Sequence, residues 1–249
     1  IELLNTLDAF LKNSKADAGN KTIAELTASL RGLLGNEKWS WYVSEKGKKK
    51  LGYEQAVVYD RVLRFEERDK LMKILYYVYL LDVYMAVANV AKERGFVFAK
   101  AHPNDKNTLV MKGAFHPFLT NPVGNTITVD ENSNVIFLTG ANMAGKSTFM
   151  KSFGITIFLA HVGFPVPAKE MEFSVQNGMF TTINLPDNLS MGYSHFYAEV
   201  LRVKKVAQQV RQTQHLIVVF DELFRGTNVK DAYDATVAVT EAFAGIRNC

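Results

Sequence analysis

The feature that most constrains the fold is an eight-residue pattern, GANMAGKS, at residues 140–147. It matches G-x-x-x-x-G-K-[ST] at every fixed position, and it lies between the apolar residues 135–139 and a helix-like stretch. Glycines let such a turn curl so that successive backbone N–H groups point inward, and the following helix adds the positive end of its dipole. The pattern therefore predicts a strand, a phosphate-binding loop and a helix, in that order.

Two side chains at the end of this loop are expected to have different roles in binding a triphosphate. Lys146 would place a cation at the β and γ phosphates, and the Ser147 hydroxyl would bind Mg²⁺. The alternative is a glycine-rich turn that binds nothing, which the strand and helix context disfavours. The candidate nucleotide-binding residues are Gly140, Ala141, Asn142, Met143, Ala144, Gly145, Lys146, Ser147 and Thr148.

Two adjacent acids, Asp221 and Glu222, follow the apolar run at residues 216–220. If that run is a strand, the acids lie at its carboxyl end, where open α/β sheets bind their ligands. Asp221 would hold Mg²⁺ through water, and Glu222 would act as the general base that orients the attacking water. Acids after a strand can also be a solvated strand end, but the phosphate loop favours the catalytic interpretation.

Two parts of the chain differ in character. Residues 1–11, 22–34, 53–68 and the stretch up to 94 read as helices, whereas short apolar strand candidates follow at residues 108–111, 126–129, 135–139 and 216–220. Strands alternating with helices predict a mostly parallel sheet covered on both faces. We expect a helical arm at residues 1–96 and an α/β nucleotide-binding domain at residues 97–249.

Residues 74–91 are apolar enough to raise the question of a membrane span, with only Asp82 and Asn89 strongly polar. A carboxylate at mid-bilayer is costly, and Leu71, Ile74, Val78, Leu81, Met85 and Ala88 repeat at the spacing of a helix packed on another helix. We therefore expect no membrane span. Cysteine occurs only at residue 249, which excludes a disulfide framework and favours a cytoplasmic protein.

The net charge of the chain is +4, and its basic residues are densest at Lys46 and residues 48–50. Such a run can meet a phosphate backbone, but a run this short is more often a solvated turn.

With TGANMAGKSTFMK (139–151) and FDELFRGTN (220–228) together, the chain resembles the ATPase domain of the MutS family, the DNA mismatch-repair ATPases of the ABC class of P-loop proteins. Further landmarks occur in the family's order: FHPFL (115–119), VGFPVPAKEMEF (162–173) and DNLSMGYSHFYAEV (187–200). The resemblance covers residues 80–249, and the preceding helices are similar to the family's core and lever helices.

The resemblance implies a P-loop ATPase that uses ATP and Mg²⁺, with Ser147 and Asp221 at the metal and Glu222 in catalysis. It implies a head-to-tail homodimer, in which Gly192 and Ser194 complete the nucleotide site of the partner subunit. The loop that crosses this interface would contain Arg225, Gly226, Thr227 and Asn228. We also expect the sequence to stop at residue 249, before the family's next strand and its histidine, so that this fragment is weakly active or inactive.

The sequence departs from the family pattern at three positions. His195 replaces a threonine, Phe224 replaces a glycine in the interface loop, and Pro122 stands where the family has an aromatic platform for adenine. No residue is therefore assigned to adenine stacking.

The resemblance implies that the protein is a DNA-maintenance ATPase, which couples an ATP-driven dimer switch to the binding of mismatched DNA. The alternative is an ATP-gated clamp on branched DNA or a ribonucleoprotein that does not read mismatches. A third function, as the ATPase subunit of an ABC transporter, is disfavoured. Transporter subunits insert a helical subdomain between the phosphate loop and the acidic motif, and the 75 positions from Lys146 to Asp221 leave little room for it.

Overall fold

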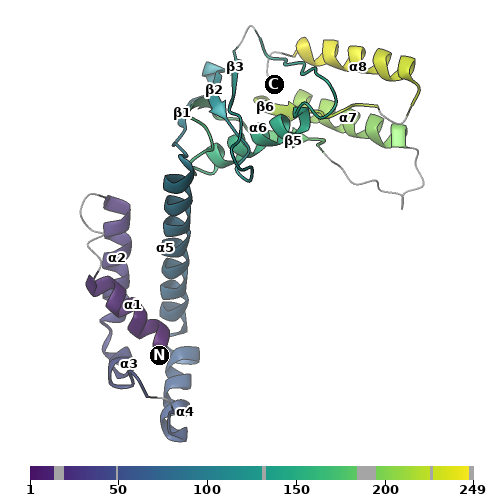
Figure 1. The fold of residues 1–249 in the computed structure, drawn as a ribbon. Coiled ribbons are helices and arrows are strands. Elements are labelled where there is room, and N and C mark those ends of the chain that lie inside the picture. The colour runs from purple at the N-terminus through teal and green to yellow at the C-terminus, as the bar shows by residue number, and fades with distance from the viewer. Residues whose placement is uncertain (14–19, 49, 131–132, 184–194, 225–226, 247–249) are drawn as a thin grey trace. The chain divides into compact units, whose positions relative to one another are not determined.

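The computed structural model describes all residues except 14–19, 49, 131–132, 184–194, 225–226 and 247–249 (Figure 1). The chain divides into two compact units, Ile1–Ala86 and Val87–Cys249. The division falls within the long helix α5 (Arg68–Arg94), before the predicted boundary at residue 96. The identities that the sequence suggests for the two parts stay predictions.

The first unit is helical, as the sequence predicts. It contains α1 (Glu2–Asn13), α2 (Lys21–Leu34), the 3-10 turn η1 (Glu37–Trp39), α3 (Trp41–Ser44), α4 (Tyr53–Arg61), the π-helical turn η2 (Val62–Glu66) and the first part of α5. Asn20 starts α2, because its side chain accepts a hydrogen bond from the Ile23 N–H at 3.2 Å. The helix predicted at residues 53–68 is divided by the π turn, after which α5 begins.

The core of this unit lies where α1, α2 and the η1–α3 segment meet one face of α5. Its buried members are Leu4, Leu7, Leu11, Leu26, Leu30, Leu34, Trp39, Tyr42, Ile74 and Leu81. The predicted packing seam of α5 is thus confirmed at Ile74 and Leu81. It is wrong at Met85, whose side chain is 48% exposed.

Among the described helices, α5 alone is long and apolar enough to cross a membrane, by length and composition only. Two of its apolar residues, Ile74 and Leu81, are buried in the core of the first unit. This packing accounts for only part of the apolar surface of α5, because 11% of its apolar 18-residue window is buried.

The second unit contains a mixed four-stranded sheet of β1 (Lys100–His102), β2 (Leu109–Ala114), β3 (Asn125–Val129) and β4 (Glu170–Ser174), in the order β1-β4-β2-β3. Strand β4 is parallel to β1 and antiparallel to β2, which is antiparallel to β3. The prediction of a mostly parallel sheet is therefore wrong here. The chain passes from β2 to β3 without a helix, and such short connections join antiparallel neighbours.

The two faces of this sheet differ. Met111, Met171 and Phe173 are buried in one cluster with Ile157 and Ala160 of α6 (Lys146–His161). Because side chains alternate along a strand, the neighbouring residues lie on the opposite face, where charged side chains pair across strands.

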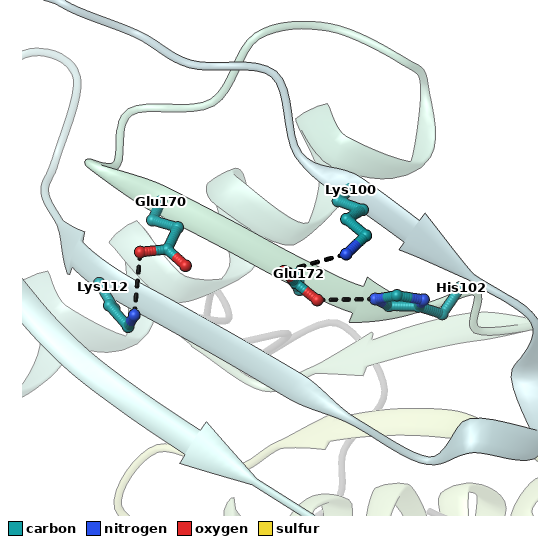
Figure 2. Close-up of polar contacts among 5 residues, drawn as sticks. All are labelled: Lys100, His102, Lys112, Glu170 and Glu172. Atoms are coloured by element: carbon teal, nitrogen blue, oxygen red, sulfur yellow. Dashed lines mark hydrogen bonds and ion pairs between the residues drawn. The ribbon is translucent and has the colours of Figure 1, made fainter.

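Figure 2 shows these pairs: Lys112 contacts Glu170 at 2.9 Å, and Glu172 contacts both Lys100 and His102, at 3.3 and 2.8 Å. The hydrogen bond from His102, followed by that from Lys100, holds the pKa of the Glu172 carboxyl below its ordinary value of 4.5. The expected cover of both sheet faces is thus not found at Lys100, Lys112 and Glu170, whose side chains are exposed.

A second, two-stranded sheet pairs β5 (Gly178–Thr181) in parallel with β6 (Leu216–Val219). Strand β6 packs on α7 (His195–Gln212) and α8 (Val229–Ala244) through a buried cluster of Val206, Val210, Leu216 and Phe243. The parallel pairing brings the carboxyl ends of β5 and β6 to the same edge.

Residues 135–139, predicted to be a strand, form none in the structure. A strand exists only through hydrogen bonds to a neighbouring strand, and among the described residues β6 pairs with β5 alone. Apolar side chains of this segment stay accessible, with Phe137 68% exposed. The prediction is therefore wrong: the run has the apolar composition of a strand but pairs with neither of the two sheets that the structure describes.

Candidate functional site

The predicted phosphate loop is a tight turn that leads directly into α6. Gly145, with φ 93°, is the residue before the helix, and its carbonyl oxygen accepts the first helical hydrogen bond from the Phe149 N–H at 2.8 Å. This left-handed conformation suits glycine, which has no Cβ to clash. Met143 also has a positive φ, of 64°, and its side chain is fully exposed at the tip of the turn.

The Lys146 side chain folds back over the turn. Its Nζ donates hydrogen bonds to the carbonyl oxygens of Gly140, at 2.8 Å, and of Ala141, at 3.0 Å. The ammonium therefore lies against the loop and next to the N-terminus of α6. Both the cation and the helix end favour an anion at this position.

Ser147 and Thr148 occupy the first turn of α6, directly after Lys146. Ser147 is half-buried, whereas Thr148 is exposed. The Thr148 carbonyl oxygen accepts a hydrogen bond from the Ser152 hydroxyl, one turn further along α6, at 2.8 Å. The helix thus fixes the position of the hydroxyl that the sequence suggests as a metal ligand.

The acid pair follows β6 at the carboxyl edge of the two-stranded sheet. The Asp221 N–H donates to the Thr182 hydroxyl at 3.2 Å, and the Thr182 N–H donates to the Val219 carbonyl oxygen at 2.9 Å. These bonds extend the β5–β6 pairing by one step and fix the backbone of Asp221. Thr182 was not predicted from the sequence, although its place at the end of the MFTT run after Gly178 follows the same strand-end logic.

The two halves of the site line the same cavity. Lys146, Asp221 and Glu222 are among the residues around a space of about 520 Å³. Most other lining residues are apolar and come from residues 135–138, α6, β6 and α8. The lysine and the acids, which the sequence separates by 75 positions, thus line one cavity, most of whose other lining residues are apolar.

The backbone after β6 has an unusual conformation. Glu222 has φ 46° and Phe224 has φ 63°, although neither is glycine. Phe224 is nevertheless buried, and its ring lies 5.6 Å from that of Phe196 in the first turn of α7. Nothing in the sequence indicates this conformation apart from the glycine that the family has at position 224.

Other predicted site residues are only partly described. Gly192, Ser194, Arg225 and Gly226 lie outside the described residues. Thr227 precedes Asn228, whose side chain accepts a hydrogen bond from the Asp231 N–H at 2.9 Å and so starts α8. Asn228 thus has a local structural role, and its predicted role at an interface stays a prediction.

Oxygen ligands are available for a metal ion. The Asp221 carboxylate and the Ser147 hydroxyl are the donor types that Mg²⁺ prefers. In the described part of the chain, no group of three or more His, Cys, Asp or Glu side chains could hold a metal ion. Phosphate oxygens and water would have to complete the coordination of a Mg²⁺ ion here, which fits the usual binding of this ion.

Comparison with known proteins connects this site to a family. Residues 136–249 match MutS domain V. The chain is 31% identical over 199 residues to a DNA mismatch repair protein MutS of Persephonella marina, which covers 76% of this chain and 22% of that protein. Proteins of the same name from Fusobacterium nucleatum and Clostridioides difficile are 33% and 30% identical, over 70% and 80% of this chain and 20% and 21% of those proteins. The chain therefore spans about a fifth of the length of these relatives.

Proposed function

The chain belongs to the MutS family of DNA mismatch-repair proteins, and from this membership we propose that it binds and hydrolyses ATP to drive a DNA-bound dimer. The observation that carries the proposal is the cavity lined by Lys146, Asp221 and Glu222. A phosphate loop alone can bind a nucleotide, but hydrolysis also requires a fixed metal ion and an oriented water molecule. The acids at the same cavity are suited to that second task.

Residues 140–148 bind the phosphates. Backbone N–H groups of the curled turn and the N-terminus of α6 face the anion, and Lys146 contacts the β and γ phosphates. Because the Lys146 ammonium is held by carbonyl oxygens of the same loop, it has to leave these oxygens for the phosphates when the nucleotide enters. A phosphate oxygen is a charged acceptor and therefore a stronger partner than a carbonyl oxygen.

Asp221 and Glu222 perform the hydrolytic half of the reaction. Ser147 and Asp221 would hold Mg²⁺, and the ion would supply positive charge against the phosphate oxygens. Glu222 orients a water molecule whose oxygen attacks the γ phosphorus, while the bond to the β–γ bridging oxygen breaks. The Glu222 carboxylate accepts the proton that the water loses.

Dimerisation would complete the site in trans. The resemblance suggests that Gly192 and Ser194 reach the nucleotide of the partner subunit and that residues 225–228 cross the interface. ATP binding would then close two head-to-tail subunits, and hydrolysis would reopen them. The names of the relatives suggest that the dimer acts on DNA, and we place the protein in the cytoplasm.

The test is ATP turnover by the natural full-length protein, alone and with perfectly paired, mismatched or branched duplexes. A Glu222→Gln variant serves as the control, because it keeps the shape of the side chain and removes the base. We expect turnover by the wild type, a response to mismatched DNA and no turnover by the variant.

Each outcome separates one part of the proposal from the others. A wild-type protein that neither binds nor hydrolyses ATP would refute the proposed activity. Turnover that responds only to branched DNA would favour the alternative of an ATP-gated clamp that does not read mismatches. Wild-type turnover by Glu222→Gln would remove Glu222 from the mechanism and leave ATP binding intact.

A further inference from the structure

Phe224 is held in a backbone conformation that its side chain disfavours. Its φ of 63° lies in the left-handed region, which bulky residues rarely adopt because Cβ comes close to the following carbonyl oxygen. Two residues earlier, Glu222 has a positive φ as well, of 46°. Strained conformations of this kind persist only where surrounding contacts enforce them, and they gather at functional sites.

The contact that enforces the conformation is visible in the structure. The Phe224 side chain is only 3% exposed, and its ring centre lies 5.6 Å from that of Phe196 with an angle of 54° between the rings. This tilted geometry is favourable for two aromatic rings. Phe196 is the second residue of α7, so the pair attaches the loop after β6 to the first turn of that helix.

The loop that is attached in this way contains the proposed general base. Glu222 lies between Asp221, whose N–H is bonded to the Thr182 hydroxyl, and the buried Phe224. Its backbone is therefore fixed from both sides, on one side by the β5–β6 edge and on the other by α7. A glycine at position 224, as in the family pattern, would adopt the same φ freely but would have no side chain to anchor the loop.

We propose that Phe224 is a positioning residue, which holds the Glu222 carboxylate in place for catalysis by anchoring its loop to α7 through Phe196. This inference rests on the proposed function and adds a requirement that is specific to this chain. Phe224 itself is not among the residues that line the cavity of Lys146, Asp221 and Glu222. Because the anchor is at the start of α7, directly after the segment that contains Gly192 and Ser194, a shift of this helix end would move Glu222.

The experiment compares variants of the full-length natural protein. Phe224→Gly removes the ring and relieves the backbone, Phe224→Leu keeps an apolar side chain, and Phe196→Ala removes the ring from the other side of the contact. Phe96→Ala is the matched control, because it removes one member of a different aromatic pair of the second unit, with ring centres 5.8 Å apart. Affinity for a non-hydrolysable ATP analogue, kcat and KM are measured for each, and kcat is expressed per nucleotide-binding site so that unfolded protein is not counted.

The proposal predicts that the variants lose the correct position of the Glu222 carboxylate but keep their affinity for the nucleotide. Phe224→Gly should bind the analogue like the wild type and leave KM unchanged, while kcat falls by about tenfold or more, which is within the contribution of a general base. Phe196→Ala should have the same effect, and the double variant should be no slower than either single variant, because both remove one contact. Phe224→Leu should recover most of the turnover, and Phe96→Ala should keep wild-type kcat.

Three results would overturn the inference. Wild-type kcat in Phe224→Gly would show that the anchor is not needed, and multiplied effects in the double variant would show that the two rings act independently. A loss of analogue affinity equal to the loss of kcat would indicate a purely structural role. If the wild type itself does not hydrolyse ATP, the proposed function fails together with this inference, whereas loss of turnover in Glu222→Gln but not in Phe224→Gly refutes this inference alone.

Discussion

Replacing Lys146 with alanine is expected to abolish nucleotide binding without weakening the fold. In the structure, the Lys146 ammonium donates hydrogen bonds of 2.8 and 3.0 Å to carbonyl oxygens of Gly140 and Ala141. Both acceptors lie in an exposed turn, so water takes over these bonds when the side chain is removed. The free energy of unfolding should therefore change by less than about 1 kcal/mol.

The effect on nucleotide affinity should be far larger. With ATP bound, the same two N–H donors would face charged phosphate oxygens, and a hydrogen bond to a charged group contributes about 1.5–3 kcal/mol. Two such bonds together contribute about 3–6 kcal/mol, which corresponds to an increase of about 10²- to 10⁴-fold in Kd. Binding at this level would be undetectable in an ordinary titration.

Isothermal calorimetry with a non-hydrolysable ATP analogue and Mg²⁺, together with thermal unfolding, measures both quantities. Lys151→Ala is the matched control, because it removes the same charge from the same helix outside the turn. A Kd of Lys146→Ala within about threefold of the wild-type value would refute the assignment of this loop to phosphates. If Lys146→Ala instead lowers the melting temperature so far that the protein unfolds at the temperature of the titration, unfolding would explain the lost binding. That result would refute the reasoning about the exposed hydrogen bonds.

Three further variants test the site, the sheet and the helical core. Glu222→Gln should bind ATP with wild-type affinity and not turn it over, as measured by analogue titration and phosphate release. Because hydrogen bonds from His102, followed by Lys100, hold the pKa of the Glu172 carboxyl below 4.5, these contacts to the carboxylate stabilise the fold fully above that pH, and the stabilisation is lost as the pH falls through the folded-state pKa. Glu172→Gln should therefore make the stability less dependent on pH below 4.5, as measured by urea unfolding at several pH values. Leu30→Ala, at a fully buried position of the helical core, should lower the free energy of unfolding by about 2–5 kcal/mol, whereas Leu3→Ala, at a residue 45% exposed, should cost much less.

Helices and the two site motifs were the parts most readable in the sequence, because their signals are local. The helix α2 lies within one residue of its prediction, since Asn20 and Gly35 mark its ends within the chain itself. The GANMAGKS pattern likewise specifies a turn and a helix start through consecutive residues. The strands β1, β4 and β5 were not predicted, because their residues mix polar or charged side chains with apolar ones and lack the continuous apolar run that marks β6.

The strand predicted at residues 135–139 failed for the same physical reason. Four apolar residues at this point satisfy the composition of a buried strand, but backbone pairing is a property of two segments and not of one. Residues 135–138 line the same cavity as β6 but form no backbone pairing with it, so the apolar composition alone did not predict the pairing.

The conformation of the acid loop could not be predicted from its own residues at all. Taken alone, the left-handed region is unfavourable for both Glu222 and Phe224, so local preference predicts the opposite of what the structure has. The conformation arises because burial of the Phe224 ring on Phe196 outweighs this preference, and that contact joins residues 28 positions apart. A sequence pattern can thus indicate the proposed catalytic acid, but not the contacts that hold its loop, which are the Asp221–Thr182 hydrogen bond on one side and the Phe224–Phe196 pair on the other. The Phe224 and Phe196 variants test the second of these contacts.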